Sequence, residues 1–174
     1  MKIPALSILA LLLVASASQA QPPFGGPDDT AYADRLWQAL TQAHLVGPNA
    51  IQSKAYPGQH PHGAVLQTIY TSLNLDGQDN RLIVKRNYGG DGVSTQSVAE
   101  NPKRFLTAIT IMYQRPGYDP DNGDWFWAKY LPDGSLDKNP AGMPLAGRVA
   151  KANPSAGCIA CHRTAPGGDM IFTK

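Results

Sequence analysis

The stretch Cys158-Ile159-Ala160-Cys161-His162, close to the C-terminus, is the segment around which this 174-residue sequence is organised. Its C-x-x-C-H spacing is typical of covalent c-type haem attachment. Positions i, i+3 and i+4 share one face of a helical turn. Cys158 and Cys161 can then each form a thioether to a haem vinyl, while His162 is carried beneath the iron as its proximal ligand. The rest of the chain is expected to form a pocket for the other haem face.

Three other interpretations of this motif are weaker. A dithiol redox site is expected in a thioredoxin-like βαβ context, whereas here the motif follows strand-like segments. A zinc site needs a fourth ligand, and the histidines that could supply one have no recognised spacing to the motif: His44, His60 and His62. A structural disulfide has poor geometry across so short a helical turn.

The N-terminus has the pattern of a secretory signal. Lys2 is followed by an apolar run from Ala5 to Val14 and by the small-residue cleavage site Ser18-Gln19-Ala20. The run is too short to favour a membrane span, so we expect the mature chain to begin at Gln21 without one. Covalent haem attachment in bacteria takes place outside the cytoplasm, which together with the signal predicts a periplasmic protein.

The composition predicts a single domain. After cleavage about 150 residues remain, enough for one hydrophobic core. The formal net charge of +2 falls close to zero without Lys2. No basic run suggests nucleic acid as a partner. Residues 21–48 are expected to form a leader and helix, and residues 49–174 a β-rich haem domain.

Hydrophobic periodicity predicts an α+β fold. A helix is expected from Asp28 or Asp29 to His44, because apolar residues recur at helical spacing. Alternation of side chains and turn residues predicts four strands, at 64–72, 81–88, 105–114 and 124–131. The result is a mainly antiparallel sheet with a leading helix and a short C-terminal haem-attachment helix. This differs from the four-helix pattern of the bundle cytochromes.

From about Ala64 onward the chain resembles the cytochrome P-460 family. The resemblance rests on the order of six segments within the β pattern: Gln67-Thr68-Ile69-Tyr70, Ile83-Val84-Lys85, Pro102-Lys103-Arg104-Phe105, Gly123-Asp124-Trp125-Phe126-Trp127, the C-x-x-C-H motif, and Asp169-Met170-Ile171-Phe172-Thr173.

This resemblance implies a β-rich homodimer with one haem c per chain, His162 on the proximal side and an open or solvent-bound distal side. The best-known members oxidise hydroxylamine and carry a lysine joined covalently to the porphyrin. Close relatives, the cytochromes c′-beta, lack that cross-link and look like binders of nitric oxide or carbon monoxide. Lys85 matches the position of the cross-linking lysine.

Strand alternation places Lys85 on the face opposite Leu82 and Val84. If those two residues fill the core, Lys85 faces the haem, where desolvation would favour the neutral amine that can act as a nucleophile. The alternative is a solvated lysine, since the neighbouring Arg86 is expected to be exposed.

Three functions remain open from the sequence. The first is oxidation of hydroxylamine or a related small nitrogen compound at a five-coordinate haem, with electrons passed to a periplasmic acceptor. A distal base would help, and the candidates are Glu100, Asp91 and Asp124. Each is more often a solvated loop carboxylate.

The second function is binding of a diatomic gas over an apolar distal face. Its candidate residues are Phe105, Phe126 and Trp127, although strand aromatics are usually plain core. The third is electron transfer at a six-coordinate haem, for which the candidate ligands are Met112, Met143 and Met170. A buried methionine fills gaps more often than it binds a metal.

Overall fold

The computed structural model describes residues 22–151 and 157–172, so the expected signal peptide lies outside the described residues. The helices are α1 (Pro27–Gln42), α2 (Thr95–Glu100), α3 (Pro102–Phe105), the 3-10 helix η1 (Pro120–Asn122) and α4 (Cys158–His162). The strands are β1 (Tyr56–Pro57), β2 (Val65–Leu75), β3 (Gln78–Tyr88), β4 (Leu106–Gln114), β5 (Trp125–Tyr130) and β6 (Ala146–Gly147). Among these helices none is long and apolar enough to cross a bilayer.

The strands form one six-stranded sheet in the order β1-β2-β3-β4-β5-β6, and each neighbouring pair is antiparallel. The predicted α+β class, with a leading helix and a short C-terminal helix, is confirmed. The two-residue strands β1 and β6 and the short helices α2 and α3 were not predicted. They lack the length at which periodicity becomes a usable signal.

The β2–β3 hairpin is longer than the sequence predicted, because its turn is only two residues. Asp76 and Gly77 both have positive φ, at 56° and 81°. This conformation fits the type I′ turn that Asp-Gly favours and matches the twist of the flanking strands. The strands therefore continue to Leu75 and resume at Gln78, and the register between them has no shift.

Helix α1 ends at Gln42, two residues before the predicted end. Pro27 starts the helix, with Asp28 and Asp29 in its first turn, where negative charge complements the helix dipole. At the other end His44 adopts a left-handed φ of 55°. This residue cannot continue a right-handed helix, so the chain turns away there.

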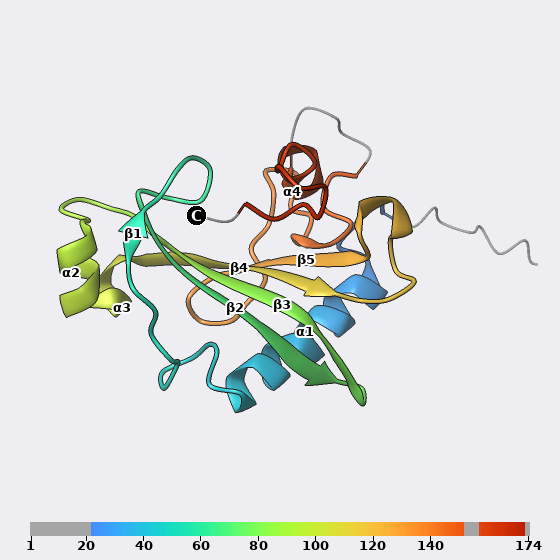
Figure 1. Ribbon diagram of the computed structural model, residues 1–174, viewed down its shortest axis with the longest axis horizontal. Helices are drawn as coiled ribbons and strands as arrows, with labels where there is room; N and C mark the ends of the chain where they lie inside the picture. Colours follow the sequence, from blue (N-terminus) through green and yellow to red (C-terminus); the bar gives the residue numbers. More distant parts are fainter. Residues whose placement is uncertain (1–21, 152–156, 173–174) are drawn as a thin grey trace, which may run out of the picture.

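The two faces of the sheet have different partners, and Figure 1 shows α1 and α4 on opposite sides of it. Helix α1 packs on one face, where Leu36 and Leu40 share a buried cluster with Leu82, Val84 and Phe126. On the other face, a second cluster around α4 contains Ile83, Met112, Trp125, Trp127 and Ile159. The predicted alternation along β3 and β5 is confirmed, and it places Lys85 on the α4 side.

Candidate haem site

Helix α4 presents the C-x-x-C-H residues to the sheet. Ile159, with no exposed surface, anchors the helix in the core of the α4 side. Cys158 is half-buried, and burial raises the pKa of its thiol to about 11. The nucleophilic cysteine of a dithiol redox site has a lowered pKa instead, so the environment of Cys158 disfavours that alternative.

The imidazole of His162 is held in one orientation. Its Nδ1 lies 2.7 Å from the carbonyl oxygen of Met170, so we assign the proton to Nδ1 and leave Nε2 as the nitrogen available to a metal. The ring is 6 % exposed, and its centre lies 4.7 Å from that of Trp127 and 5.4 Å from that of Phe172. Burial lowers the pKa of His162, which favours the neutral form that binds metals.

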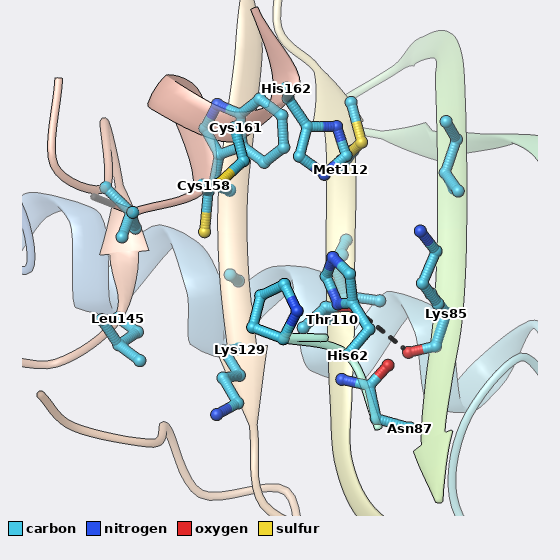
Figure 2. Close-up of a pocket in the computed structure, with 17 residues that line it drawn as sticks. His62, Lys85, Asn87, Thr110, Met112, Lys129, Leu145, Cys158, Cys161 and His162 are labelled. Carbon is cyan, nitrogen blue, oxygen red and sulfur yellow. Dashed lines mark hydrogen bonds between the residues drawn. The ribbon is translucent and has the colours of Figure 1, made fainter. Parts of the chain in front are cut away.

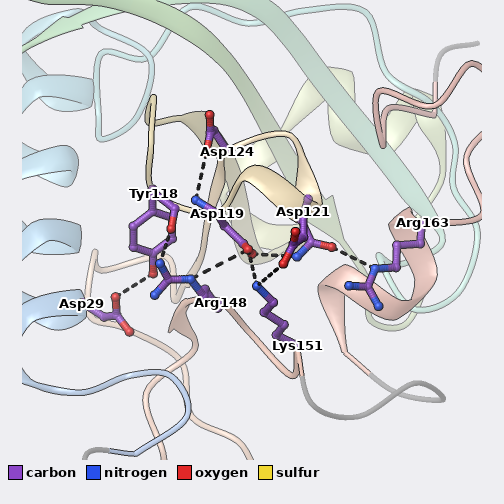
Figure 3. Close-up of polar contacts among 9 residues, drawn as sticks. Asp29, Tyr118, Asp119, Asp121, Asp124, Arg148, Lys151 and Arg163 are labelled. Atoms are coloured by element: carbon purple, nitrogen blue, oxygen red, sulfur yellow. Dashed lines mark hydrogen bonds and ion pairs between the residues drawn. The ribbon is translucent and has the colours of Figure 1, made fainter.

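A polar network ties α4 to the loop around η1, as Figure 3 shows. Arg163, directly after α4, donates from Nε to Asn122 Oδ1 at 2.8 Å, and Asn122 donates to Asp119 Oδ2 at 2.8 Å. Asp119 is 1 % exposed and also pairs with Lys151 and Arg148. The ion pair with Asp119 raises the pKa of Lys151. A buried carboxylate needs such partners, and here they fix the helix that carries His162.

A cavity of about 270 Å³ lies between α4 and the centre of the sheet (Figure 2). Two cross-strand rows of β3, β4 and β5 form its floor. One row is Lys85, Thr110 and Lys129, and the other is Ile83, Met112 and Trp127. The cavity is also lined by His62, Asn87, Cys158, Cys161 and His162.

The structure therefore brings Lys85 together with Cys158, Cys161 and His162. The half-buried Lys85 contributes to lowering the pKa of His162, although burial is the larger cause. The second lysine of the cavity, Lys129, is paired with Asp137 at 2.7 Å. The prediction that Arg86 is exposed is wrong: Arg86 is 3 % exposed, points to the α1 side and donates to the carbonyl of Leu45 at 2.8 Å. Alternation assigned its face correctly but not its burial.

The residues that the sequence offered as candidates for the distal side lie in different parts of the structure. Trp127 and Met112 line the cavity, whereas Phe126 belongs to the core beneath α1 and Phe105 to a separate cluster beside α2 and α3. Met143 and Met170 pack in the cluster on the α4 side. None of Asp91, Glu100 and Asp124 lines the cavity, and the described residues that line it include no carboxylate, although one of them, Lys129, pairs with the carboxylate of Asp137.

In the sequence His62 has no recognised spacing to the C-x-x-C-H motif, and nothing there assigned it to the haem site. In the structure its half-buried ring lies 6.1 Å from that of His162, centre to centre. Burial lowers the pKa of His62 to about 3, with smaller contributions from Lys85, His162 and Lys129. No motif spacing could have found it, because the loop is placed by contacts with β3. His44 and His60 are exposed, and the described residues contain no cluster of three metal-binding side chains, so a zinc site gains no support.

Residues 29–173 match the family model of cytochrome P460. The chain belongs to the cytochrome P460 family. No curated protein and no solved structure was found to match it. Membership implies a haem-binding cytochrome, in agreement with the resemblance recognised in the sequence from Ala64 onward.

The residues around the cavity fit a haem. His162 directs a neutral nitrogen donor from α4, two cysteines precede it at attachment spacing, and one of the two rows of the floor is apolar. Two residues that line the cavity, Trp127 and Asn87, each carry a buried polar atom with no hydrogen-bond partner among the described residues, namely Trp127 Nε1 and Asn87 Oδ1. Buried polar atoms are normally satisfied, and a bound group with polar atoms at this place would fit these two residues.

Proposed function

We propose that this chain is a periplasmic mono-haem c-type cytochrome that oxidises hydroxylamine or a related small nitrogen compound. The observation that carries the proposal is that Lys85 lines the same cavity as Cys158, Cys161 and His162. When bound, the haem would supply the electron-accepting centre. Cys158 and Cys161 would hold it by thioethers, and His162 would be its proximal ligand.

Lys85 would lie over or beside the porphyrin edge. The place of Lys85 in the centre of the sheet supports this, since Thr68 on β2 and Thr110 on β4 stand opposite it in register. Desolvation beside a bound haem would favour the neutral amine, the form that can attack carbon. Asn87 and Thr110, close to Lys85 on the same face, could hydrogen-bond a small polar substrate.

Binding of nitric oxide or carbon monoxide, as in the cytochromes c′-beta, is the second candidate. The observation that favours it is the lack of a carboxylate among the described residues that line the cavity. Oxidation of hydroxylamine releases protons, which a distal base would accept. A gas ligand needs no such base. Homodimer formation and a periplasmic electron acceptor remain predictions under either function.

The test compares the haem-loaded wild type with Lys85→Ala, Lys85→Arg and the control Lys103→Ala, which removes an exposed lysine of α3. We expect Lys85→Ala and Lys85→Arg to change the optical spectrum and to abolish hydroxylamine-dependent reduction of an added acceptor, with Lys103→Ala unchanged. The thioethers should survive in all four proteins. A wild type without this activity that binds nitric oxide, with an unchanged Lys85→Ala spectrum, would shift the function to gas binding.

Tryptic mapping makes the test sharper. Trypsin cleaves after Arg81, Lys85 and Arg86, so an unmodified Lys85 yields the peptide 82–85. If Lys85 is joined to the porphyrin, cleavage at Lys85 is blocked and residues 82–86 appear attached to the haem peptide. Recovery of the 82–85 peptide in full would rule out the cross-link.

A further inference from the structure

Two imidazoles face each other across the cavity. His162 extends from α4 and His62 from the loop before β2, and Figure 2 shows a ring nitrogen of each turned toward the other. The ring centres are 6.1 Å apart and the ring planes lie at 84°. His62 stands on the far side of the cavity from the helix that carries the cysteines, where the distal face of a haem held by α4 would lie.

The spacing distinguishes two roles for His62. Two metal–nitrogen bonds of about 2 Å each, plus the two ring radii, place the centres of a bis-imidazole pair about 6 Å apart. A histidine that only hydrogen-bonds to an iron-bound ligand stands about 2–3 Å further away, because a hydrogen bond and another atom intervene. The observed 6.1 Å matches the first arrangement.

From this spacing we infer that His62 is the second axial ligand of the haem iron in the resting protein. The inference rests on the haem site of the proposed function, and it departs from the open distal side that the family resemblance implies. Coordination by His62 would require neither electron transfer nor cleavage of a covalent bond in the chain. A substrate or gas would exchange with the neutral imidazole nitrogen at the iron, and His62 would move aside.

The loop that carries His62 is fastened at its base rather than at its tip. Gly58 N donates to Ala64 O at 2.8 Å, and Ala64 N donates to Tyr88 O at the end of β3 at 3.1 Å. Gly63, at φ +108°, lies so close to β3 that a Cβ would stand 2.7 Å from the Tyr88 carbonyl oxygen. These contacts hold the backbone beside His62 against the sheet and leave the exposed His60 on the outer side of the loop.

The test uses the haem-loaded full chain, with His62→Ala and the control His60→Ala, which removes the exposed histidine two residues away. We expect low-spin six-coordinate iron in the ferric wild type and in His60→Ala, and high-spin iron in His62→Ala, by resonance Raman and electron paramagnetic resonance. Added imidazole should restore the low-spin signal of His62→Ala. Carbon monoxide should bind the ferrous His62→Ala protein at least about tenfold faster or tighter, because the competing ligand is gone.

The outcomes separate this inference from the proposed function. A high-spin wild type, or a low-spin signal that persists in His62→Ala, overturns the assignment of His62 and leaves hydroxylamine oxidation to its own assay. A low-spin wild type that becomes high-spin in His62→Ala supports the assignment even if hydroxylamine is not oxidised. Retention of covalent haem in His62→Ala, measured on the denatured chain, verifies that the variant has matured.

Discussion

The two faces of the sheet differ in role: the face toward α1 forms a hydrophobic core, and the face toward α4 lines the candidate haem site. Neighbouring residues of β3 illustrate the difference. Val84 and Arg86 face α1, where the core closes around side chains that are almost entirely buried. Lys85 and Asn87 face α4, where the sheet leaves a cavity that both residues line. A period of two thus lets one strand complete a hydrophobic core and line a cofactor site at once. We therefore expect substitutions on the α1 side to lower stability, and substitutions on the α4 side to change the haem spectrum.

The largest effect is expected from His162, the proposed proximal ligand on the α4 side. His162→Ala should keep both thioethers but lose native iron coordination, and with it the native optical spectrum and hydroxylamine oxidation. Absorption spectra of the ferric and ferrous variant, with acid-acetone extraction to check the thioethers, provide the measurement. A native spectrum in His162→Ala would show that another residue is the proximal ligand.

Substitutions on the α1 side should lower the free energy of unfolding without changing the haem spectrum. Leu36 has no exposed surface, so Leu36→Ala should lower the free energy of unfolding by about 2–5 kcal/mol through lost burial and the remaining cavity. The haem spectrum of the folded variant should stay that of the wild type. Urea denaturation followed by far-ultraviolet circular dichroism measures the loss. A change in the native haem spectrum would break the proposed division between faces.

Adjacent residues of β3 give the sharpest comparison. Arg86→Ala should cost about 1–3 kcal/mol of stability, since the buried carbonyl of Leu45 loses its donor, and should leave the spectrum unchanged. Lys85→Ala should do the reverse, with a changed spectrum and a stability change below about 1 kcal/mol. Both variants can be measured by the same urea titration and absorption spectra. If Arg86→Ala perturbs the haem as strongly as Lys85→Ala, the faces are coupled rather than separate.

The effect with the narrowest range of conditions concerns alkaline pH. Burial raises the pKa of Tyr88 from 10 to about 12, and its hydroxyl donates to Gln67 at 2.6 Å. The unfolded chain therefore loses this proton at a lower pH than the folded one. The contribution of Tyr88 to stability is complete below pH 10 and is lost between pH 10 and 12, at up to about 1.4 kcal/mol per pH unit.

Urea titrations at pH 9, 10 and 11 measure this slope, and Tyr88→Phe should flatten it. The variant also loses the hydrogen bond to Gln67, so its stability should be lower at pH 9, and only the slope tests the pKa. An identical slope in the wild type and Tyr88→Phe would exclude Tyr88 as a source of alkaline destabilisation.

The sequence predicted those parts of the molecule that depend on local pattern. Alternation placed Leu82 and Val84 in the core and Lys85 on the opposite face, and the C-x-x-C-H spacing located α4. It could not predict His62, because loop geometry depends on close backbone contacts between Gly63 and Tyr88. It also misjudged Arg86, since burial of a charged side chain depends on α1 and the loop at Leu45 folding over it. Such long-range contacts produce no periodic pattern in the local sequence, so they cannot be predicted from it.

The proposed function depends above all on covalent attachment of a haem by Cys158 and Cys161, against the face of the sheet opposite α1. Tryptic peptide mapping of the denatured, acid-acetone-extracted protein tests it most directly, because cleavage after Lys151 and Arg163 isolates the motif in the peptide 152–163. We expect this peptide to carry one haem, and the corresponding peptide of the double variant Cys158→Ala/Cys161→Ala to carry none. Quantitative release of haem from the wild type, or haem found only on another peptide, would rule out covalent attachment at this motif.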